Sequence, residues 1–177
     1  TSVWPIPDAA FDRLVRSRDR FWQTLARDGE IFRVYFFSDR GSIYALGYPT
    51  TTYDTEGEMV GTPRPVPPID GEVLASLVAR FSGTIEQLPP SYSAKKLAGR
   101  KLYELARAGE EVPREPKTVT IFELQLRATA PDRLWFSGTC SSGTYVRSLA
   151  HDIGEILGCG GHLASLRRVR IGPWLAA

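Results

Sequence analysis

The stretch CSSGTYVRSLAHDIGEILGCGG at residues 140–161 constrains the fold more than any other part of the chain. Hydroxyl side chains at its start can cap a first helical turn, and Gly158 can supply the left-handed residue that ends a helix. We therefore expect a helix over residues 144–157. Its apolar residues recur at helical spacing, so one face should be buried, and Arg147 lies beside that face at the border of the core. The expected caps are Ser141, Ser142 and Thr144, and the apolar residues are Val146, Leu149, Ala150, Ile153 and Leu157.

Two predicted strands lead directly into this helix. Residues 119–126 alternate apolar and polar side chains, with a slip of phase near Phe122 that indicates a β-bulge. Ala-Pro-Asp at residues 130–132 favours a turn, and residues 134–140 have the composition of a second strand. We expect an antiparallel hairpin whose second strand runs into the helix that carries Arg147.

Further helices and strands are predicted upstream. Residues 8–29 have a helical apolar spacing, and residues 31–37 and 43–46 are β-branched and aromatic enough for strands. Residues 62–68, TPRPVPP, contain four prolines and must form an extended connector.

A second well-capped helix should follow this connector. Asp70 is a good N-cap, the apolar stripe after it ends at Phe81, and Gly83 stops the pattern. A shorter helix is expected over residues 101–108. The predicted fold class is α+β, with a mixed, mainly antiparallel sheet and packed helices.

Composition limits the class of protein. The 177 residues, 42% hydrophobic and 24% charged, are enough for one globular domain with a real core. No apolar run approaches membrane-spanning length, and residues 1–14 lack the regions of a signal peptide. We therefore expect a cytoplasmic protein with no membrane association.

The charge is distributed unevenly along the chain. Residues 1–89 carry 9 Lys and Arg against 12 Asp and Glu, which gives −3, whereas residues 90–177 carry 13 against 8, which gives +5. Clustered cations release counterions from phosphates, so the second half is suited to a polyanionic partner. A solvated basic surface with no such partner explains the charge alone equally well.

Two cysteines and two histidines could be interpreted as the four ligands of a metal site. Only Cys159 and His162 have the close spacing of a structural zinc site, while His151 falls in the middle of the predicted helix. Together with Cys140, these residues are better explained as free thiols and surface histidines. We therefore expect no metal and no disulfide framework.

Three segments resemble the TruB-type tRNA pseudouridine synthases, which isomerise a uridine in the T-loop of tRNA. They are TTTYDTEG at residues 50–57, PPSYSAKKLAGRKLYELARAGEEVPREPKTVT at residues 89–120, and GTYVRSLAHDIGEILGCGGHLASLRRVRIGP at residues 143–173. The order is that of the family, and the resemblance extends over residues 46–174. It implies the C-terminal part of a pseudouridine synthase-like catalytic domain over residues 46–177, after a divergent helix-plus-strand segment over residues 1–45.

The resemblance also implies a substrate and a set of site residues. The partner would be RNA, the tRNA T-stem-loop, bound by a monomer that needs no cofactor. Arg147 matches the arginine that ion-pairs with the family's nucleophilic aspartate, and Tyr44 is the candidate for the tyrosine that packs on the base. The matching substrate-binding positions are Lys96, Tyr103, Arg107 and Leu166, and the basic residues expected to contact phosphates are Lys96, Arg100, Lys101, Arg167, Arg168 and Arg170.

The first part of the chain departs from the family pattern. The nucleophile of these enzymes lies in a GHxGTLDP motif, and no match to it occurs in residues 1–49. Asp39 is the aspartate nearest to Tyr44 and the only candidate substitute, while Asp54 matches the TYD element and not the nucleophile. After Trp174 there is also no room for the family's C-terminal RNA-binding extension.

Three functional hypotheses follow from this pattern. The first is a pseudouridine synthase with a divergent N-terminal segment. The second is an RNA-binding module that keeps the basic surface without catalysis. The third is a truncated or hybrid fragment with no activity of its own.

Overall fold

The computed structural model describes two long ranges, residues 42–91 and 114–168, and several short strands outside them. The first range contains strand β3 (Ser42–Leu46), helix α3 (Gly71–Phe81) and strand β4 (Gly83–Gln87). The second contains β7 (Lys117–Ala130), β8 (Arg133–Cys140), helix α5 (Val146–Ile156) and β9 (Gly161–Ser165). The backbone of the short strands is also described: β1 (Trp4–Ile6), β2 (Val34–Phe36), β5 (Lys96–Leu97), β6 (Arg100–Lys101), β10 (Arg170–Ile171) and β11 (Trp174–Ala176).

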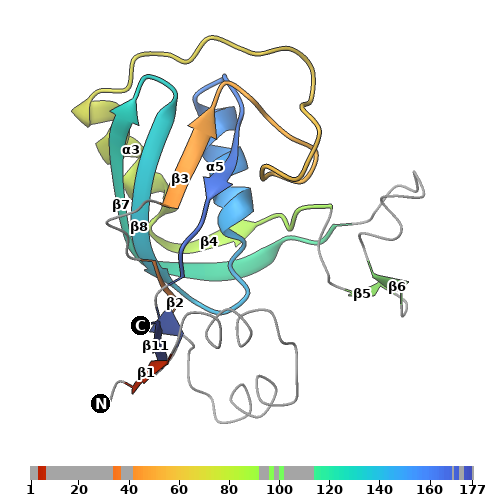
Figure 1. The fold of residues 1–177 in the computed structure, drawn as a ribbon, viewed down its shortest axis with the longest axis vertical. Coiled ribbons are helices and arrows are strands. Elements are labelled where there is room, and N and C mark those ends of the chain that lie inside the picture. Colours follow the sequence, from red (N-terminus) through yellow and green to blue (C-terminus); the bar gives the residue numbers. More distant parts are fainter. Residues whose placement is uncertain are drawn as a thin grey trace.

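Strand β8 is the centre of the main sheet. It pairs antiparallel with β7 along one edge and with β3 and β2 along the other (Figure 1). Strand β9 then pairs antiparallel with β3, and β4 with β7. The sheet is mainly antiparallel, with one parallel pair between β1 and β11.

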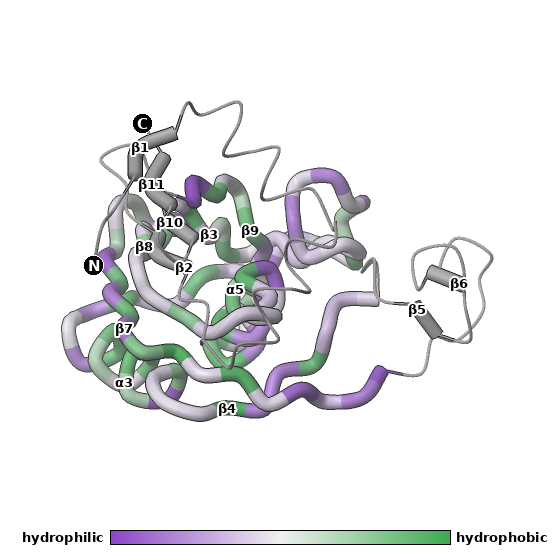
Figure 2. The backbone as a smooth tube through the Cα atoms, turned by 90° about the horizontal axis from the view of Figure 1, so that it is seen from below, coloured by the Kyte–Doolittle hydropathy of each residue, from purple (hydrophilic) through white to green (hydrophobic). Residues whose placement is uncertain are grey.

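The two helices and the sheet enclose one apolar core. Helix α3 contributes Leu77 and Phe81 to it, and α5 contributes a full stripe that includes Leu149 and Ile153. Figure 1 shows both helices behind the sheet, and Figure 2 shows hydrophobic positions gathered where helices and central strands meet. The predicted α+β class is confirmed. No helix within the two long described ranges is long and apolar enough to span a membrane.

The hairpin and the Asp70 helix match their predictions closely. The register of β7 against β8 shifts between Ile121 and Glu123, which places the expected bulge at Phe122. Asp70 Oδ1 accepts hydrogen bonds from the amides of Glu72 and Val73, at 3.0 and 2.9 Å. Residues 63–70 have no regular secondary structure, as the prolines require.

The start of helix α5 differs from its prediction. The helix begins at Val146, and its N-cap residue Tyr145 makes no side-chain cap hydrogen bond. Ser141 Oγ instead accepts from the Thr120 amide of β7, and Thr144 Oγ1 donates to the Ser141 carbonyl. The hydroxyls of Ser141 and Thr144 therefore bind β7 and the connecting loop instead of the first turn of the helix. The predicted end is confirmed, because Gly158 has a φ of +73°.

Other expectations fall on residues beyond the described part. The helix over residues 8–29 and most of the helix over residues 101–108 lie there. The prediction of a helical Lys101 is wrong, because Lys101 lies in β6 and pairs with Lys96 of β5. The predicted division between residues 45 and 46 falls inside β3, which is hydrogen-bonded to both β8 and β9.

Candidate active site around Arg147

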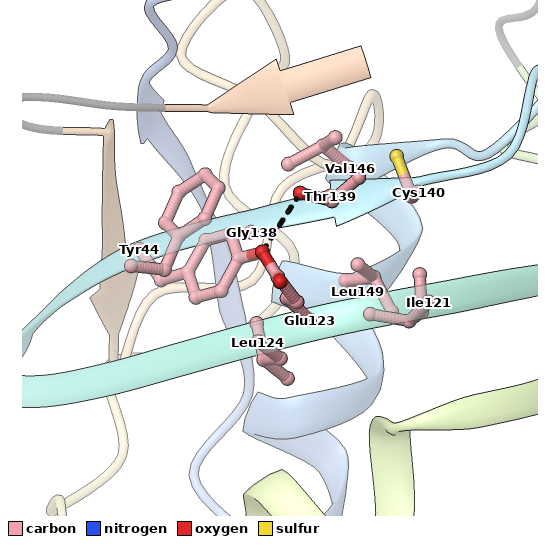
Figure 3. Close-up of a pocket in the computed structure, with 10 residues that line it drawn as sticks. Tyr44, Ile121, Glu123, Leu124, Gly138, Thr139, Cys140, Val146 and Leu149 are labelled. Carbon is pink, nitrogen blue, oxygen red and sulfur yellow. Dashed lines mark hydrogen bonds between the residues drawn. The ribbon is translucent and has the colours of Figure 1, made fainter. Parts of the chain in front are cut away.

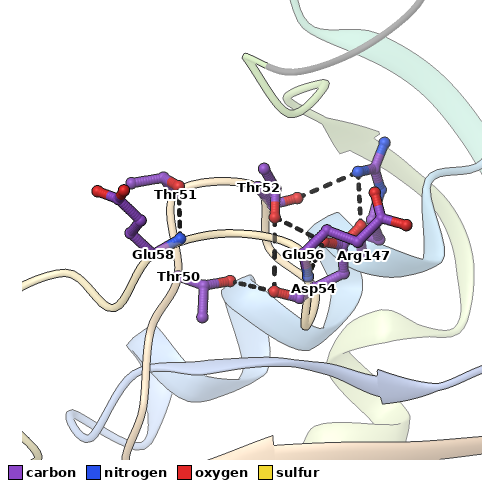
Figure 4. Close-up of polar contacts among 7 residues, drawn as sticks. All are labelled: Thr50, Thr51, Thr52, Asp54, Glu56, Glu58 and Arg147. Carbon is purple, nitrogen blue, oxygen red and sulfur yellow. Dashed lines mark hydrogen bonds and ion pairs between the residues drawn. The ribbon is translucent and has the colours of Figure 1, made fainter.

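The loop over residues 50–57 lies against helix α5 and is attached to the sheet. The Leu163 amide of β9 donates to the Tyr53 carbonyl at 2.9 Å, and Asp54 forms a parallel bridge with Leu163. Thr50 Oγ1 donates to the Asp54 carbonyl at 2.7 Å (Figure 4). The backbone of Asp54 is thus held in place by contacts that do not involve the helix.

An ion pair joins this loop to the helix. Arg147 Nη1 lies 2.7 Å from Asp54 Oδ2, and the same nitrogen donates to the Thr52 carbonyl at 3.3 Å. The side chains are only 27% and 17% exposed, respectively. The other carboxylate oxygen, Oδ1, accepts from Thr52 Oγ1 at 2.5 Å and from the Glu56 amide at 3.0 Å. Both oxygens of Asp54 are therefore engaged, and the guanidinium is held in one orientation.

Tyr53 and His151 form a second contact between the loop and the helix. Their rings are stacked, with centroids 3.9 Å apart and planes 7° from parallel. The Tyr53 hydroxyl accepts a hydrogen bond from Arg114 Nη1 at 3.2 Å. His151 follows Arg147 by four residues, which is one helical turn, so both side chains face the loop. Burial lowers the pKa of His151, which favours the neutral imidazole in this stack.

The backbone of Tyr53 is unusual for a residue with a side chain. Its φ is +64°, and among the described residues it is the only non-glycine with a positive φ. Such a conformation costs on the order of 1 kcal/mol and persists only where surrounding contacts enforce it. Here the enforcing contacts are the stack on His151 of helix α5 and the hydrogen bond from Leu163 of strand β9.

The site is suited to binding or stabilising an anion. A partly exposed guanidinium, oriented by a carboxylate, can oppose negative charge on a phosphate or a reacting carboxylate. Within the two long described ranges, no group of three or more His, Cys, Asp or Glu side chains lies close enough together to hold a metal ion. Cys140 and Cys159 are buried free thiols, and burial raises the pKa of Cys140 to about 11.

Tyr44 does not lie where the predicted base-stacking role requires. It is 0% exposed, and its ring stacks on Phe136 of β8 with centroids 3.9 Å apart. The small pocket beside it, lined by α5 residues Val146 and Leu149 among others, holds only about 10 Å³ (Figure 3). This is about the space of one water molecule, so no base can pack on the ring in this arrangement. Tyr44 is a core residue under the buried face of α5.

The other predicted site residues are described to different extents. Leu166 is half-buried against the apolar core, and Arg168 is also half-buried. Arg167 is exposed, and its backbone amide donates to Ser42 Oγ at 3.1 Å. Lys96 is described only as a backbone position in β5, and Asp39, Tyr103 and Arg107 lie outside the described residues.

Four site residues were missed by the sequence reasoning: Tyr53, Asp54, Arg114 and His151. The four-residue spacing of Arg147 and His151 could have indicated that they share a helix face. The spacing from residue 54 to residue 147 contains no such signal, because only the attachment of the loop to β9 brings the ion pair together.

Two family models match consecutive parts of this chain. The family model of the TruB family pseudouridylate synthase (N terminal domain) matches residues 42–146, and that of the tRNA pseudouridylate synthase B C-terminal domain matches residues 147–177. The two matches meet inside α5, so Asp54 and Arg147 fall in different family models while forming one ion pair.

Curated relatives carry the same family name. The tRNA pseudouridine synthase B of Syntrophotalea carbinolica is 43% identical over 155 residues, covering 88% of this chain and 48% of the relative. That of Pseudomonas syringae pv. syringae is 52% identical over 132 residues, covering 75% of this chain and 43% of the relative. The chain thus spans about half the length of the curated relatives it matches.

A solved structure supports the fold. The crystal structure of a Cbf5-Nop10-Gar1 complex contains a chain that matches 82% of this one with a TM-score of 0.52, at 22% identity, over 33% of its own length. Because the family model over residues 42–146 matches more than half of the chain, this chain belongs to the TruB family of pseudouridylate synthases.

Proposed function

We propose that this chain is the part of a tRNA pseudouridine synthase that holds the arginine side of the catalytic cleft. The observation that carries the proposal is the Arg147–Asp54 ion pair, which joins two segments that each resemble the family. Curated relatives named tRNA pseudouridine synthase B support uridine in tRNA as the substrate. The T-loop is the region of tRNA that the resemblance implies.

The reaction places specific demands on the protein. The uracil must leave the base stack, lose its bond to the sugar through nitrogen, rotate, and rejoin the sugar through carbon. The atoms of substrate and product are the same, so no cofactor is consumed. A fixed guanidinium contributes by keeping a neighbouring carboxylate ionised and by opposing charge that develops on the detached base.

Asp54 is better suited to orienting Arg147 than to attacking the substrate. Its two carboxylate oxygens accept three hydrogen bonds, from Thr52, Glu56 and Arg147, so each oxygen is already engaged by a protein donor. We therefore assign Asp54 as a positioning residue. The attacking carboxylate is not assigned, and Asp39 stays a candidate outside the described residues.

The RNA contacts complete the proposal. Arg167 and Arg168 follow β9, on the segment where Leu166 packs against the core, and they would contact phosphates without reading sequence. We also propose that the protein is cytoplasmic and acts as a monomer.

One assay with a matched control tests the function. A T-stem-loop RNA is incubated with the protein, and pseudouridine is mapped by carbodiimide-dependent reverse-transcription stops. Arg147→Lys keeps the charge but loses the planar fork, so we expect the rate to fall about 100-fold. Arg133→Lys is the control, because Arg133 forms a comparable 2.8 Å ion pair with Asp132 at the exposed hairpin turn. Equal rates for the two variants would contradict the role of Arg147.

A second candidate function is RNA binding without catalysis. It needs only the basic residues that follow β9, Arg167 and Arg168, which can contact phosphates without any chemistry at Arg147. In that case the T-stem-loop would bind with an affinity that falls steeply with salt, and no pseudouridine would form. Formation of product by the wild-type chain would exclude this second candidate.

A further inference from the structure

We propose that Gln87, at the end of β4, is a positioning residue that sets where Arg147 stands relative to Asp54. The proposal rests on the proposed function for its kinetic consequence, but its geometric content can be tested separately. The first turn of α5 has no side-chain cap of its own.

The side-chain amide of Gln87 replaces that missing cap. Its Oε1 accepts from the Tyr145 amide at 2.6 Å, and its Nε2 donates to the Tyr145 carbonyl at 3.0 Å. Gln87 is 1% exposed, so neither bond competes with bulk water. A two-point contact of this kind fixes both the position and the direction of the backbone as it enters the helix.

A second bond on the other side of Arg147 strengthens the attachment. Ser148 is fully buried, and its Oγ donates to the Leu88 carbonyl at 2.8 Å. Residues 87 and 88 therefore bind residues 145 and 148, which bracket Arg147 in the sequence. The amide of Gln87 is the larger contributor, because it satisfies one donor and one acceptor of the backbone at once.

The two partners of the ion pair are thus anchored to different strands. Gln87 belongs to β4, where it pairs with Lys117 of β7, whereas the loop that carries Asp54 is attached to β9. Strands β4 and β9 lie at opposite ends of the series β4-β7-β8-β3-β9. The distance between Arg147 and Asp54 therefore depends on each anchor, and loss of the Gln87 contact would let the helix start move while Asp54 stays in place.

Misplacement of a catalytic group by about 1 Å costs on the order of 100-fold in rate. We therefore expect Gln87→Leu, which removes both hydrogen bonds at similar volume, to lower kcat on a T-stem-loop RNA by about 10- to 100-fold. KM should change by less than about threefold, because the phosphate-contacting residues after β9 are untouched. Gln125→Leu is the matched control, since Gln125 is an exposed glutamine on β7, and it should react like wild type.

A conservative variant gives a readout that simple destabilisation would not produce. An ionised glutamate at position 87 can accept from the Tyr145 amide but cannot donate to its carbonyl, whereas a protonated one can do both. A buried glutamate has a raised pKa. The ratio of Gln87→Glu to wild-type kcat should therefore rise toward one as the pH is lowered, while the ratio for Gln87→Leu stays low throughout.

A spectroscopic measurement separates this proposal from the proposed function. The guanidinium NMR signals of Arg147, assigned by their loss in Arg147→Lys, should show slower rotation in wild type than in Gln87→Leu. This comparison stands even if wild type forms no pseudouridine, which would overturn the function alone. Unchanged Arg147 signals in folded Gln87→Leu would overturn the positioning role. If Gln87→Leu does not fold, the Gln87→Glu signals at low and high pH decide, and an absence of any pH dependence relative to wild type would overturn the role.

Discussion

Two tyrosines of this chain stack on a neighbouring ring with almost the same geometry, yet in opposite surroundings. Tyr44 lies 3.9 Å from Phe136 at 10°, and Tyr53 lies 3.9 Å from His151 at 7°. The Tyr44 ring is enclosed in the apolar core, and its hydroxyl has no hydrogen-bond partner in the described part of the chain. The Tyr53 ring is half-buried, and its hydroxyl accepts from Arg114.

The difference shows that a stacked pair does not by itself indicate a binding site. Tyr44 is held by burial, which is non-directional, and its role is to fill volume under α5. Tyr53 is held by directional contacts to a helix, a strand and an arginine, and it has a strained backbone. Strain and directional polar contacts gather at sites more often than in cores. The resemblance predicted Tyr44 as the tyrosine of the site, whereas the geometry places Tyr53 next to the Arg147–Asp54 ion pair.

Truncation of the two rings should have very different effects on stability. Tyr44→Ala leaves a large cavity in the core and should lower the free energy of unfolding by about 3–5 kcal/mol. Tyr53→Ala loses a half-buried stack and one hydrogen bond, and should cost about 1–2 kcal/mol. Urea denaturation of both variants measures the difference. Equal losses would show that the two stacks contribute equally to the free energy of unfolding, and would contradict the distinction between a core tyrosine and a site tyrosine.

Removal of the hydroxyls alone should shift stability in opposite directions. Tyr44→Phe relieves a buried polar group that has no partner among the described residues, so the free energy of unfolding should rise by about 1 kcal/mol. Tyr53→Phe removes the acceptor for Arg114 and should lower it by about 1 kcal/mol or less. Thermal and urea unfolding report the sign, and a loss of stability in Tyr44→Phe would point to an unrecognised partner for its hydroxyl.

The smallest expected effect is a pH dependence of stability that the Tyr53 stack has and the Tyr44 stack lacks. Burial lowers the pKa of His151, with Arg114 acting in the same direction and Glu155 against it. The unfolded chain then binds more protons near its ordinary pKa of about 6.5, so this contribution to stability is present above that pH and is lost as the pH falls through it.

The test compares wild type with His151→Gln at about pH 7.5 and about pH 5.5. Wild type should lose more stability than the variant on acidification. The variant is needed because burial raises the pKa of the neighbouring Asp152 to about 6, which acts with the opposite sign. The difference in stability between Tyr44→Phe and wild type should be the same at both pH values, since burial raises the pKa of Tyr44 well above its ordinary value. Parallel pH profiles for wild type and His151→Gln would contradict the placement of His151.

Much of the fold could be predicted because its signals are local. The apolar stripe before Phe81, the Asp70 cap, the bulge at Phe122 and the positive φ of Gly158 each depend on a few consecutive residues. The caps of α5 could not be predicted, because the hydroxyls near its start bind the adjoining loop and strand. The cap comes instead from Gln87, 58 residues earlier in the chain.

The sequence by itself determined the family, the mainly antiparallel sheet, helices α3 and α5 of the described part, and the place of Arg147 beside a buried helix face. The tertiary structure alone decided that Asp54 is its partner, that Tyr44 belongs to the core, and that Tyr53 stacks on His151. Periodicity and capping are written in neighbouring residues, whereas an ion pair across 93 positions exists only once strands β3, β8 and β9 have aligned the loop with the helix.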